Sequence, residues 1–149
     1  FKEELECIET YFALEEARFG NKIRLVKDID ESLLHYEIPV LSIQPLVENA
    51  VRHGLSPKLG PGTVTISAHL KGRELRITIS DDGVGIPPHR LHEVLKPGVG
   101  SGNGVGLSNV NERFKSLYGE DYGLKIQSKE GVGTKISLRI PLHHPAHAK

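Results

Sequence analysis

Residues 63–80, TVTISAHLKGRELRITIS, contain two runs in which apolar and polar residues alternate, and KGR at 71–73 separates them. Alternation with a period of two predicts strands with one buried face, and a short polar link predicts a hairpin. A second pair of runs, 122–128 and 133–141, flanks KEGV at 129–132 and predicts another hairpin. The chain is therefore expected to build an antiparallel sheet.

Helical patterns surround these hairpins. Residues 1–19 carry apolar side chains at helical spacing among charges, and Gly20 is a suitable stop. A second helix is expected from Pro39 to His53, with Gly54 as its stop and Pro45 bending its first turns.

Two further helices and one strand complete the pattern. A short helix is expected near 88–95, a longer one from about Gly104 to Leu117 with a stop near Gly119, and a strand at 22–29. The sum is an α/β (α+β) two-layer sandwich, in which a mostly antiparallel mixed sheet carries its helices on one face.

Composition limits the function classes. The 149 residues match one globular domain, and 19 basic against 19 acidic residues give no excess charge that would favour bulk nucleic acid. Cys7 is the single cysteine, which excludes a disulfide framework and a Cys-rich metal site. No apolar run reaches the length of a membrane span. The chain lacks Met and begins inside a helical pattern, so we expect it to be part of a longer protein.

The stretch GVGSGNGVGLSNV, residues 98–110, has glycine at every second position from 98 to 106. It is neither a Walker loop, because no Gly-Lys pair occurs in the chain, nor a Rossmann fingerprint, because no GxGxxG fits. Glycines that lead into a helix allow a phosphate to approach unpaired backbone N–H groups. A mobile surface loop followed by a helix cap explains this stretch equally well.

Two other segments carry polar residues that can be explained either by a functional role or by an ordinary structural one. In DDGVG, 81–85, a carboxylate at a strand end can accept a hydrogen bond from an exocyclic amine, although an Asp-Gly turn is common. In PLVENAVRHG, 45–54, Asn49 beside Glu48 can hold Mg²⁺ through oxygen and Glu48 can act as a general base. The alternative is a solvated face with a Glu48–Arg52 ion pair. A fourth segment, EGVGT at 130–134, is by itself a hairpin turn.

Taken together and in this order, the four segments resemble the ATP-binding domain of the GHKL superfamily, which includes gyrase, Hsp90, histidine kinases and MutL. The stretches IPVLSIQPLVENAVRHG, GNGVGLSNVNERFKSLYG and GVGTKISLRIP are similar to sensor histidine kinases of the autolysin-regulator (Lyt) type. This resemblance covers nearly the whole chain and implies a Bergerat-type ATP-binding fold.

The resemblance implies roles for the residues of the second predicted helix. Asn49 would hold the Mg²⁺ that bridges the ATP phosphates, and Glu48 would orient water or the incoming acceptor. Arg52 would contact phosphate and His53 would line the nucleotide. Many histidine kinases carry a second Asn where this chain has Pro45, which leaves a second protein ligand of the metal unassigned.

It also implies roles for the remaining segments. Asp81 would accept the adenine amine, Gly83 and Gly85 would let the base pack closely, and Thr134 would support the adenine end. The glycine-rich stretch would form a lid edge at 98–101, followed by a lid hinge and a phosphate-facing helix start, made of Gly102, Gly104, Val105, Gly106 and Leu107.

The implied organisation has three parts: a helix at 1–20 that leads from an absent dimerisation and phosphoacceptor region, the ATP-binding domain at 21–142, and a tail at 143–149. None of the eight histidines lies in the acceptor context of these kinases. The γ-phosphoryl of ATP would therefore pass to a histidine outside this chain and then to a response-regulator aspartate. The whole protein would be a homodimer whose kinase domain lies on the cytoplasmic side of a membrane-anchored sensor.

Two rival functions use the same segments. One is a GHKL ATPase that hydrolyses ATP to drive a clamp, with Glu48 as the base toward water. The other is a non-catalytic nucleotide-sensing or docking module.

Overall fold

The computed structural model describes residues 1–20, 22–39, 41–91 and 105–142. Its sheet is built from five strands in the order β1-β2-β3-β5-β4. The strands are β1 (Ile23–Ile29), β2 (Gly62–Lys71), β3 (Glu74–Asp81), β4 (Lys125–Lys129) and β5 (Gly133–Pro141). β1 runs parallel to β2. The other three pairings are antiparallel, and two of them, β2 with β3 and β4 with β5, are the hairpins that the sequence predicts.

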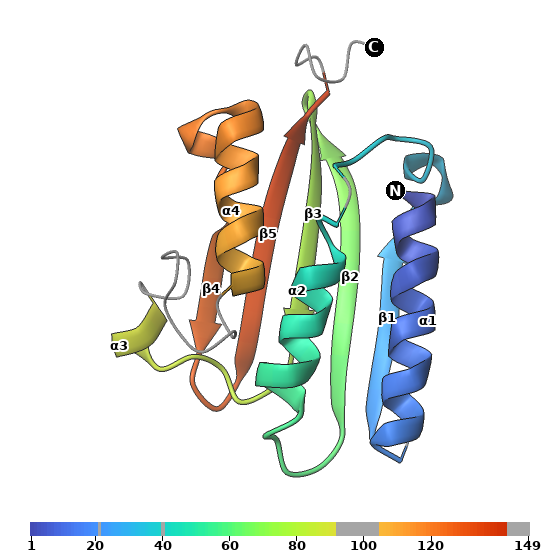
Figure 1. Cartoon of the computed structure of the whole chain (residues 1–149), viewed down its shortest axis with the longest axis vertical. Helices are drawn as coiled ribbons and strands as arrows, with labels where there is room; N and C mark the ends of the chain where they lie inside the picture. Colours follow the sequence, from blue (N-terminus) through green and yellow to red (C-terminus); the bar gives the residue numbers. More distant parts are fainter. Residues whose placement is uncertain (21, 40, 92–104, 143–149) are drawn as a thin grey trace.

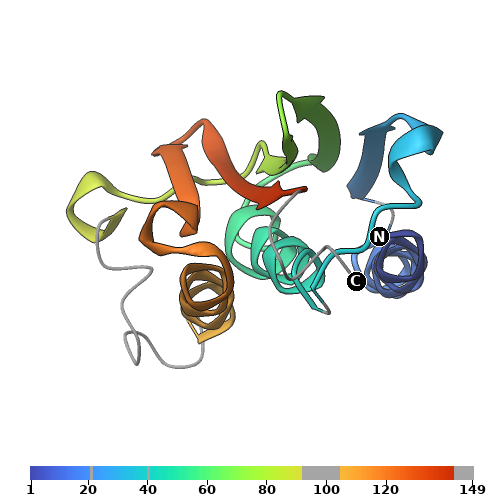
Figure 2. The same ribbon diagram turned by 90° about the horizontal axis from the view of Figure 1, so that it is seen from above.

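The helices α1, α2 and α4 cover one face of this sheet, which Figures 1 and 2 show from two directions. The α-helices are α1 (Lys2–Arg18), α2 (Gln44–Asn49), α3 (Pro88–Leu91) and α4 (Val105–Tyr118). Short turns of other helix types are η1 (Glu31–Leu33), η2 (Ala50–Leu55) and η3 (Glu120–Tyr122). The predicted two-layer α/β sandwich is therefore confirmed. None of the helices in the described ranges has the length and apolar character that a membrane crossing needs.

The alternation within the strands sets the core. In β3 the side chains of Leu75, Ile77 and Ile79 are buried, while the residues between them face away from the helices. Helices α1, α2 and α4 contribute apolar side chains to the same core, among them Ile8, Phe12, Leu46, Val47, Val110 and Phe114. The exposed side of α1 includes Cys7.

The second predicted helix differs at both ends. It begins at Gln44 rather than Pro39, and Pro45 lies in its first turn, where a missing N–H costs nothing, so it does not bend the helix. It passes through Gly54 and ends at Leu55 rather than stopping at His53. Its last part, η2, is a π-helix, because the N–H of Ser56 donates to the carbonyl of Val51 at 2.8 Å.

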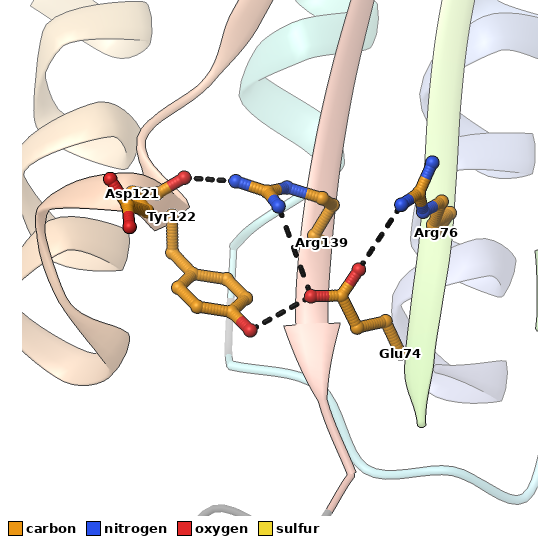
Figure 3. A network of polar contacts seen from close by, with 5 residues as sticks. All are labelled: Glu74, Arg76, Asp121, Tyr122 and Arg139. Carbon is orange, nitrogen blue, oxygen red and sulfur yellow. Dashed lines mark hydrogen bonds and ion pairs between the residues drawn. The ribbon is translucent and has the colours of Figure 1, made fainter. Parts of the chain in front are cut away.

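At the end of β3 opposite Asp81, a polar network joins the sheet to η3 (Figure 3). The Glu74 carboxylate accepts a hydrogen bond from the Tyr122 hydroxyl at 2.8 Å and lies 3.4 and 3.8 Å from the guanidinium groups of Arg76 and Arg139. Arg139 also lies 4.8 Å from the centre of the Tyr122 ring and donates to the Asp121 carbonyl. These contacts hold η3, which follows α4, against β3 and β5.

Candidate nucleotide-binding site

The candidate site lies where the end of β3, the turn that follows it, the helix α2–η2 and the β4–β5 turn meet. Asp81 ends β3 and lies opposite Thr134 of β5 in the antiparallel register. The structure thus brings two of the predicted segments, far apart in sequence, side by side.

The Asp81 carboxyl is mostly enclosed by protein. Its Oδ1 accepts a hydrogen bond from the Gly83 N–H at 2.9 Å. Burial raises the pKa of this carboxyl to about 6, and the adjacent charge of Asp82 adds to the rise, whereas backbone hydrogen bonds from Gly83 and Thr134 and the charge of Lys58 oppose it. An ionised carboxylate in such a place is a strong acceptor for a ligand N–H group.

Two glycines permit this approach of strand end and helix. A Cβ atom on Gly54 would lie 2.6 Å from Asp81 Oδ1, and a Cβ on Gly83 would overlap the Gly54 carbonyl. The same Gly54 carbonyl accepts a hydrogen bond from the Val84 N–H at 3.0 Å. Gly54, predicted only as a helix stop, is therefore part of the site. No local signal in the sequence marks this role.

The β4–β5 turn closes the other side of the segment 81–85. Gly85 has a φ of 74°, and a Cβ there would overlap the Lys129 carbonyl. The Ser128 hydroxyl accepts from the Ile86 N–H at 2.8 Å and lies 2.8 Å from the buried Thr134 hydroxyl. Ser128, which the sequence analysis did not single out, thus connects Thr134 to the turn after Asp81.

The helix α2–η2 presents the polar residues predicted for phosphate and metal. The Asn49 side chain is half-buried and has no hydrogen-bond partner among residues of the described ranges. The His53 ring is also half-buried, and burial together with the positive charges of Arg52 and Arg90 lowers its pKa. The lowered pKa favours the neutral imidazole of His53 at pH 7.

The alternative interpretation of this helix, a solvated face, predicts an ion pair between Glu48 and Arg52. Among the ion pairs of the described residues, this pair does not occur. Glu48 accepts a hydrogen bond from the Gln44 side chain at 3.0 Å. Both charges act on Tyr11 of α1: burial, Glu15 and Glu48 raise the pKa of Tyr11 to about 12, and Arg52 opposes the rise. The polar face of α2–η2 therefore lies near α1.

The start of α4 lies beside the start of α2. A Cβ on Gly106 would lie 3.5 Å from Pro45 Cβ, an ordinary contact, and Leu107 is buried in the core. Val105 is the first residue of α4. Gly102 and Gly104, with the predicted lid edge at 98–101, lie outside the described residues. The order of the segments in space is thus α1, α2–η2, then α4 (Figure 2).

Comparison with known proteins decides the family. A model of the histidine kinase-, DNA gyrase B- and HSP90-like ATPases matches residues 39–144. The chain belongs to this ATPase family. The resemblance to the GHKL superfamily is thereby confirmed.

The similarity to curated relatives covers more of the chain than the family match at 39–144 does. Sensor histidine kinase YpdA of Escherichia coli strain K12 is 47% identical over 140 residues, which are 94% of this chain and 24% of YpdA. Sensor protein LytS of Staphylococcus haemolyticus is 38% identical over 142 residues, 94% of this chain and 24% of LytS. The similarity to Lyt-type sensor kinases is thus confirmed, and the chain spans about a quarter of the length of both proteins.

Solved structures show the same fold for the ATPase domain. The blue-light activated histidine kinase of Erythrobacter litoralis EL346 superposes with a TM-score of 0.70 at 22% identity, covering 97% of this chain and 42% of that chain. The catalytic domain of histidine kinase ThkA superposes with a TM-score of 0.67 at 21% identity, covering 95% of each chain.

Proposed function

We propose that this chain is the ATP-binding catalytic domain of a sensor histidine kinase. It would bind ATP with Mg²⁺ and deliver the γ-phosphoryl group to a histidine on a dimerisation domain outside the chain. The observation that carries the proposal is the enclosed Asp81 carboxylate, held by the Gly83 N–H at a strand end in a chain of this ATPase family.

The adenine end of the nucleotide is assigned to Asp81 and its neighbours. The carboxylate accepts a hydrogen bond from the exocyclic amine of adenine, a pairing that is strong where water is largely excluded. Gly83 and Gly85 let the base approach the backbone, and Thr134 supports this end through its hydroxyl and Ser128.

The phosphate end is assigned to α2–η2 and the start of α4. The Asn49 carboxamide, to which no residue of the described ranges is hydrogen-bonded, offers an oxygen ligand of the kind that Mg²⁺ prefers. No cluster of three His, Cys, Asp or Glu side chains occurs within the described ranges, and a second protein ligand of the metal stays unassigned. When bound, Mg²⁺ neutralises phosphate charge. Arg52 adds a positive charge, and the neutral His53 lines the nucleotide.

The first turn of α4 is assigned to the phosphates as well. Val105, Gly106 and Leu107 offer backbone N–H groups that α4 itself leaves unpaired. Gly102 and Gly104 are proposed as the hinge of a lid.

Glu48 is proposed to orient the incoming acceptor rather than to activate water. Its carboxylate accepts a hydrogen bond from the Gln44 side chain, which orients it. Rapid ATP hydrolysis by the chain alone, lost in Glu48→Gln, would instead establish the clamp ATPase.

For the whole protein, we propose a homodimer in which residues 1–20 lead from the dimerisation region. The phosphoryl group passes from the acceptor histidine to a response-regulator aspartate. We also propose that the whole protein is a membrane-anchored sensor with this domain on the cytoplasmic side; the names of the relatives, both sensor proteins, support the sensor role.

The proposal is tested by calorimetric ATP binding, with and without Mg²⁺, to the wild-type chain, Asp81→Asn and Asp82→Asn. Asp82 is the matched control, because it is the adjacent acid but is exposed and accepts from the Thr63 N–H instead. We expect Asp81→Asn to weaken binding by about tenfold or more and Asp82→Asn to bind like wild type. Equal binding by all three chains would refute the adenine assignment.

Phosphoryl transfer is then tested in trans. The chain is mixed with a separately prepared acceptor-helix fragment of a relative and with ATP labelled at the γ-phosphate. Label on the fragment's histidine that depends on Asn49 supports a kinase, whereas tight ATP binding without any transfer would establish the nucleotide-sensing module.

A further inference from the structure

The segment that leads into α2 contains a strained residue. Leu41 has a φ of 56°, and within the described ranges it is the one residue other than glycine with a positive φ. This backbone conformation is unfavourable for an L-residue with a side chain, and it persists only where neighbouring groups hold it. Half of the Leu41 side chain is exposed, so its own packing does not account for the strain.

A carboxylate from α1 holds this segment on one side. Glu4 Oε1 accepts a hydrogen bond from the Ser42 N–H at 3.3 Å, and Oε2 accepts from the Gln44 N–H at 2.9 Å and from the Ile43 N–H. Three consecutive backbone donors thus converge on one side chain that is about 40 residues away in the sequence. Hydrogen bonds to a charged acceptor are among the stronger ones in proteins.

A guanidinium from α4 holds the same segment on the other side. An N–H of Arg113 donates to the Leu41 carbonyl at 2.8 Å and approaches the Ser42 hydroxyl at 3.3 Å. The Arg113 Nε is buried and has no partner in the described part of the chain. Within that part, the guanidinium group is therefore held by its contacts with Leu41 and Ser42. Ser42 itself is fully buried and donates to the Pro39 carbonyl at 2.5 Å.

The clamped segment therefore joins three helices. Gln44 begins α2, which carries Asn49 five residues later, and α4 begins beside Pro45. A second link between α1 and the helix α2–η2 is electrostatic, since the charges of Glu48 and Arg52 shift the pKa of Tyr11 in α1. A shift of α1 cannot leave the entry of α2 unchanged while Glu4 keeps its three donors.

We propose that Glu4 and Arg113 are positioning residues that clamp the strained segment 41–44 and thereby couple the position of α1 to the affinity of the site for ATP. This inference rests on the proposed function, because it takes α2 and α4 as the helices that bind the phosphates. The clamp keeps the site in its binding-competent arrangement. Without it, that arrangement is only fractionally populated, and the apparent Kd rises by the inverse of that fraction.

The first test compares Glu4→Gln with Glu3→Gln. Glutamine keeps the shape of Glu4 but replaces one acceptor oxygen by an NH₂ group that faces a backbone donor. Glu3 lies in the same first turn of α1 but is exposed and contacts none of the described residues in the clamped segment. For MgATP measured by calorimetry, we expect Kd to rise by about fivefold or more in Glu4→Gln and to stay unchanged in Glu3→Gln.

A second readout separates positioning from a structural role. In hydrogen exchange, the amides of Ser42, Ile43 and Gln44 are expected to be protected in the wild-type chain, to be protected further by MgATP, and to lose both effects in Glu4→Gln. A merely structural role would lower the melting temperature and leave the Kd of the folded protein unchanged, and that result would overturn the inference.

A rescue variant tests the strain itself. Glycine adopts a φ of 56° without penalty, so Leu41→Gly is expected to restore part of the ATP affinity lost in Glu4→Gln. A further loss of affinity in the double variant would overturn the inference. Failure of the proposed function looks different: the wild-type chain would then not bind MgATP at all, and Asp81→Asn would change nothing.

Discussion

Replacing Asp81 by Asn is expected to make the fold more stable at neutral pH while it weakens ATP binding. Burial raises the pKa of the Asp81 carboxyl from 3.8 to about 6, a difference of about 2 units. One unit corresponds to about 1.4 kcal/mol, so keeping the buried carboxylate ionised costs about 2 to 3 kcal/mol once residual solvent screening is allowed for. Asparagine keeps the acceptor for the Gly83 N–H and carries no charge.

The pH dependence fixes the sign of this effect. Below pH 3.8 the carboxyl is protonated in both the folded and the unfolded chain, so wild type and Asp81→Asn differ little in charge. Between pH 4 and 6 the unfolded chain loses the proton first, so the free energy of unfolding of wild type falls as pH rises. Above pH 7 the full penalty applies to wild type and not to the variant.

Urea unfolding of both chains, followed by circular dichroism at pH 4, 5, 6, 7 and 8, measures this difference. The stability of Asp81→Asn minus that of wild type should grow by about 2 to 3 kcal/mol from pH 4 to pH 7, and the melting temperature at pH 7 should rise by roughly 5 to 10 °C. Asp82→Asn serves as control and should show a much smaller rise, because it removes only the charge that adds to the burial of Asp81. A difference that stays constant from pH 4 to pH 8 would refute the enclosed environment on which the argument depends.

Three other predictions follow from contacts described above. Gly83→Ala is expected to lower the free energy of unfolding in urea by more than about 3 kcal/mol, since its Cβ would overlap the Gly54 backbone. Gly106→Ala is expected to raise the free energy of unfolding by about 0.5 kcal/mol, because alanine has the higher helix propensity. Similar values for the two variants would contradict the close approach of Gly83 to Gly54. Asn49→Ala should weaken calorimetric ATP binding by about tenfold in Mg²⁺ and hardly at all in EDTA, and an equal loss in both would exclude it as a metal ligand. Tyr122→Phe removes the hydrogen bond to Glu74 and should cost about 1 kcal/mol in urea with ATP affinity unchanged; a loss of affinity would show that the two ends of β3 communicate.

Most of the fold follows from short-range patterns. The runs at 63–70 and 74–80 alternate strictly, and they form β2 and β3 because only one face of the sheet is covered by helices. Helical spacing predicts helices at 1–19 and 104–117. The ends of α1 and α4 in the described residues differ from these predicted ends by one residue. Where one period dominates, local sequence predicts the element.

What the sequence did not predict depends on contacts between distant segments. The helix predicted from Pro39 begins at Gln44, because residues before it are held in a strained conformation by Glu4 and Arg113. Gly54 continues the helix instead of ending it, since the π-turn directs its carbonyl to Val84. Neither effect has a local signature.

In the candidate site, too, some residues could be predicted from local motifs and others only from the contacts between distant segments. Asp81 and Thr134 could be chosen from the order of their motifs, and the structure places them opposite each other in register. Ser128 lies in an alternating run with no distinguishing neighbour, so only the pairing of β4 with β5 brings it to the site.

The exposed cysteine of α1 has a practical consequence for spectroscopy. Cys7 is the only thiol in the chain and lies one helical turn after Glu4, on a side of α1 that water reaches. A maleimide dye or a nitroxide therefore attaches at a single position without any engineered substitution. The label reports directly on the movement of α1 while nucleotide is titrated into the natural sequence.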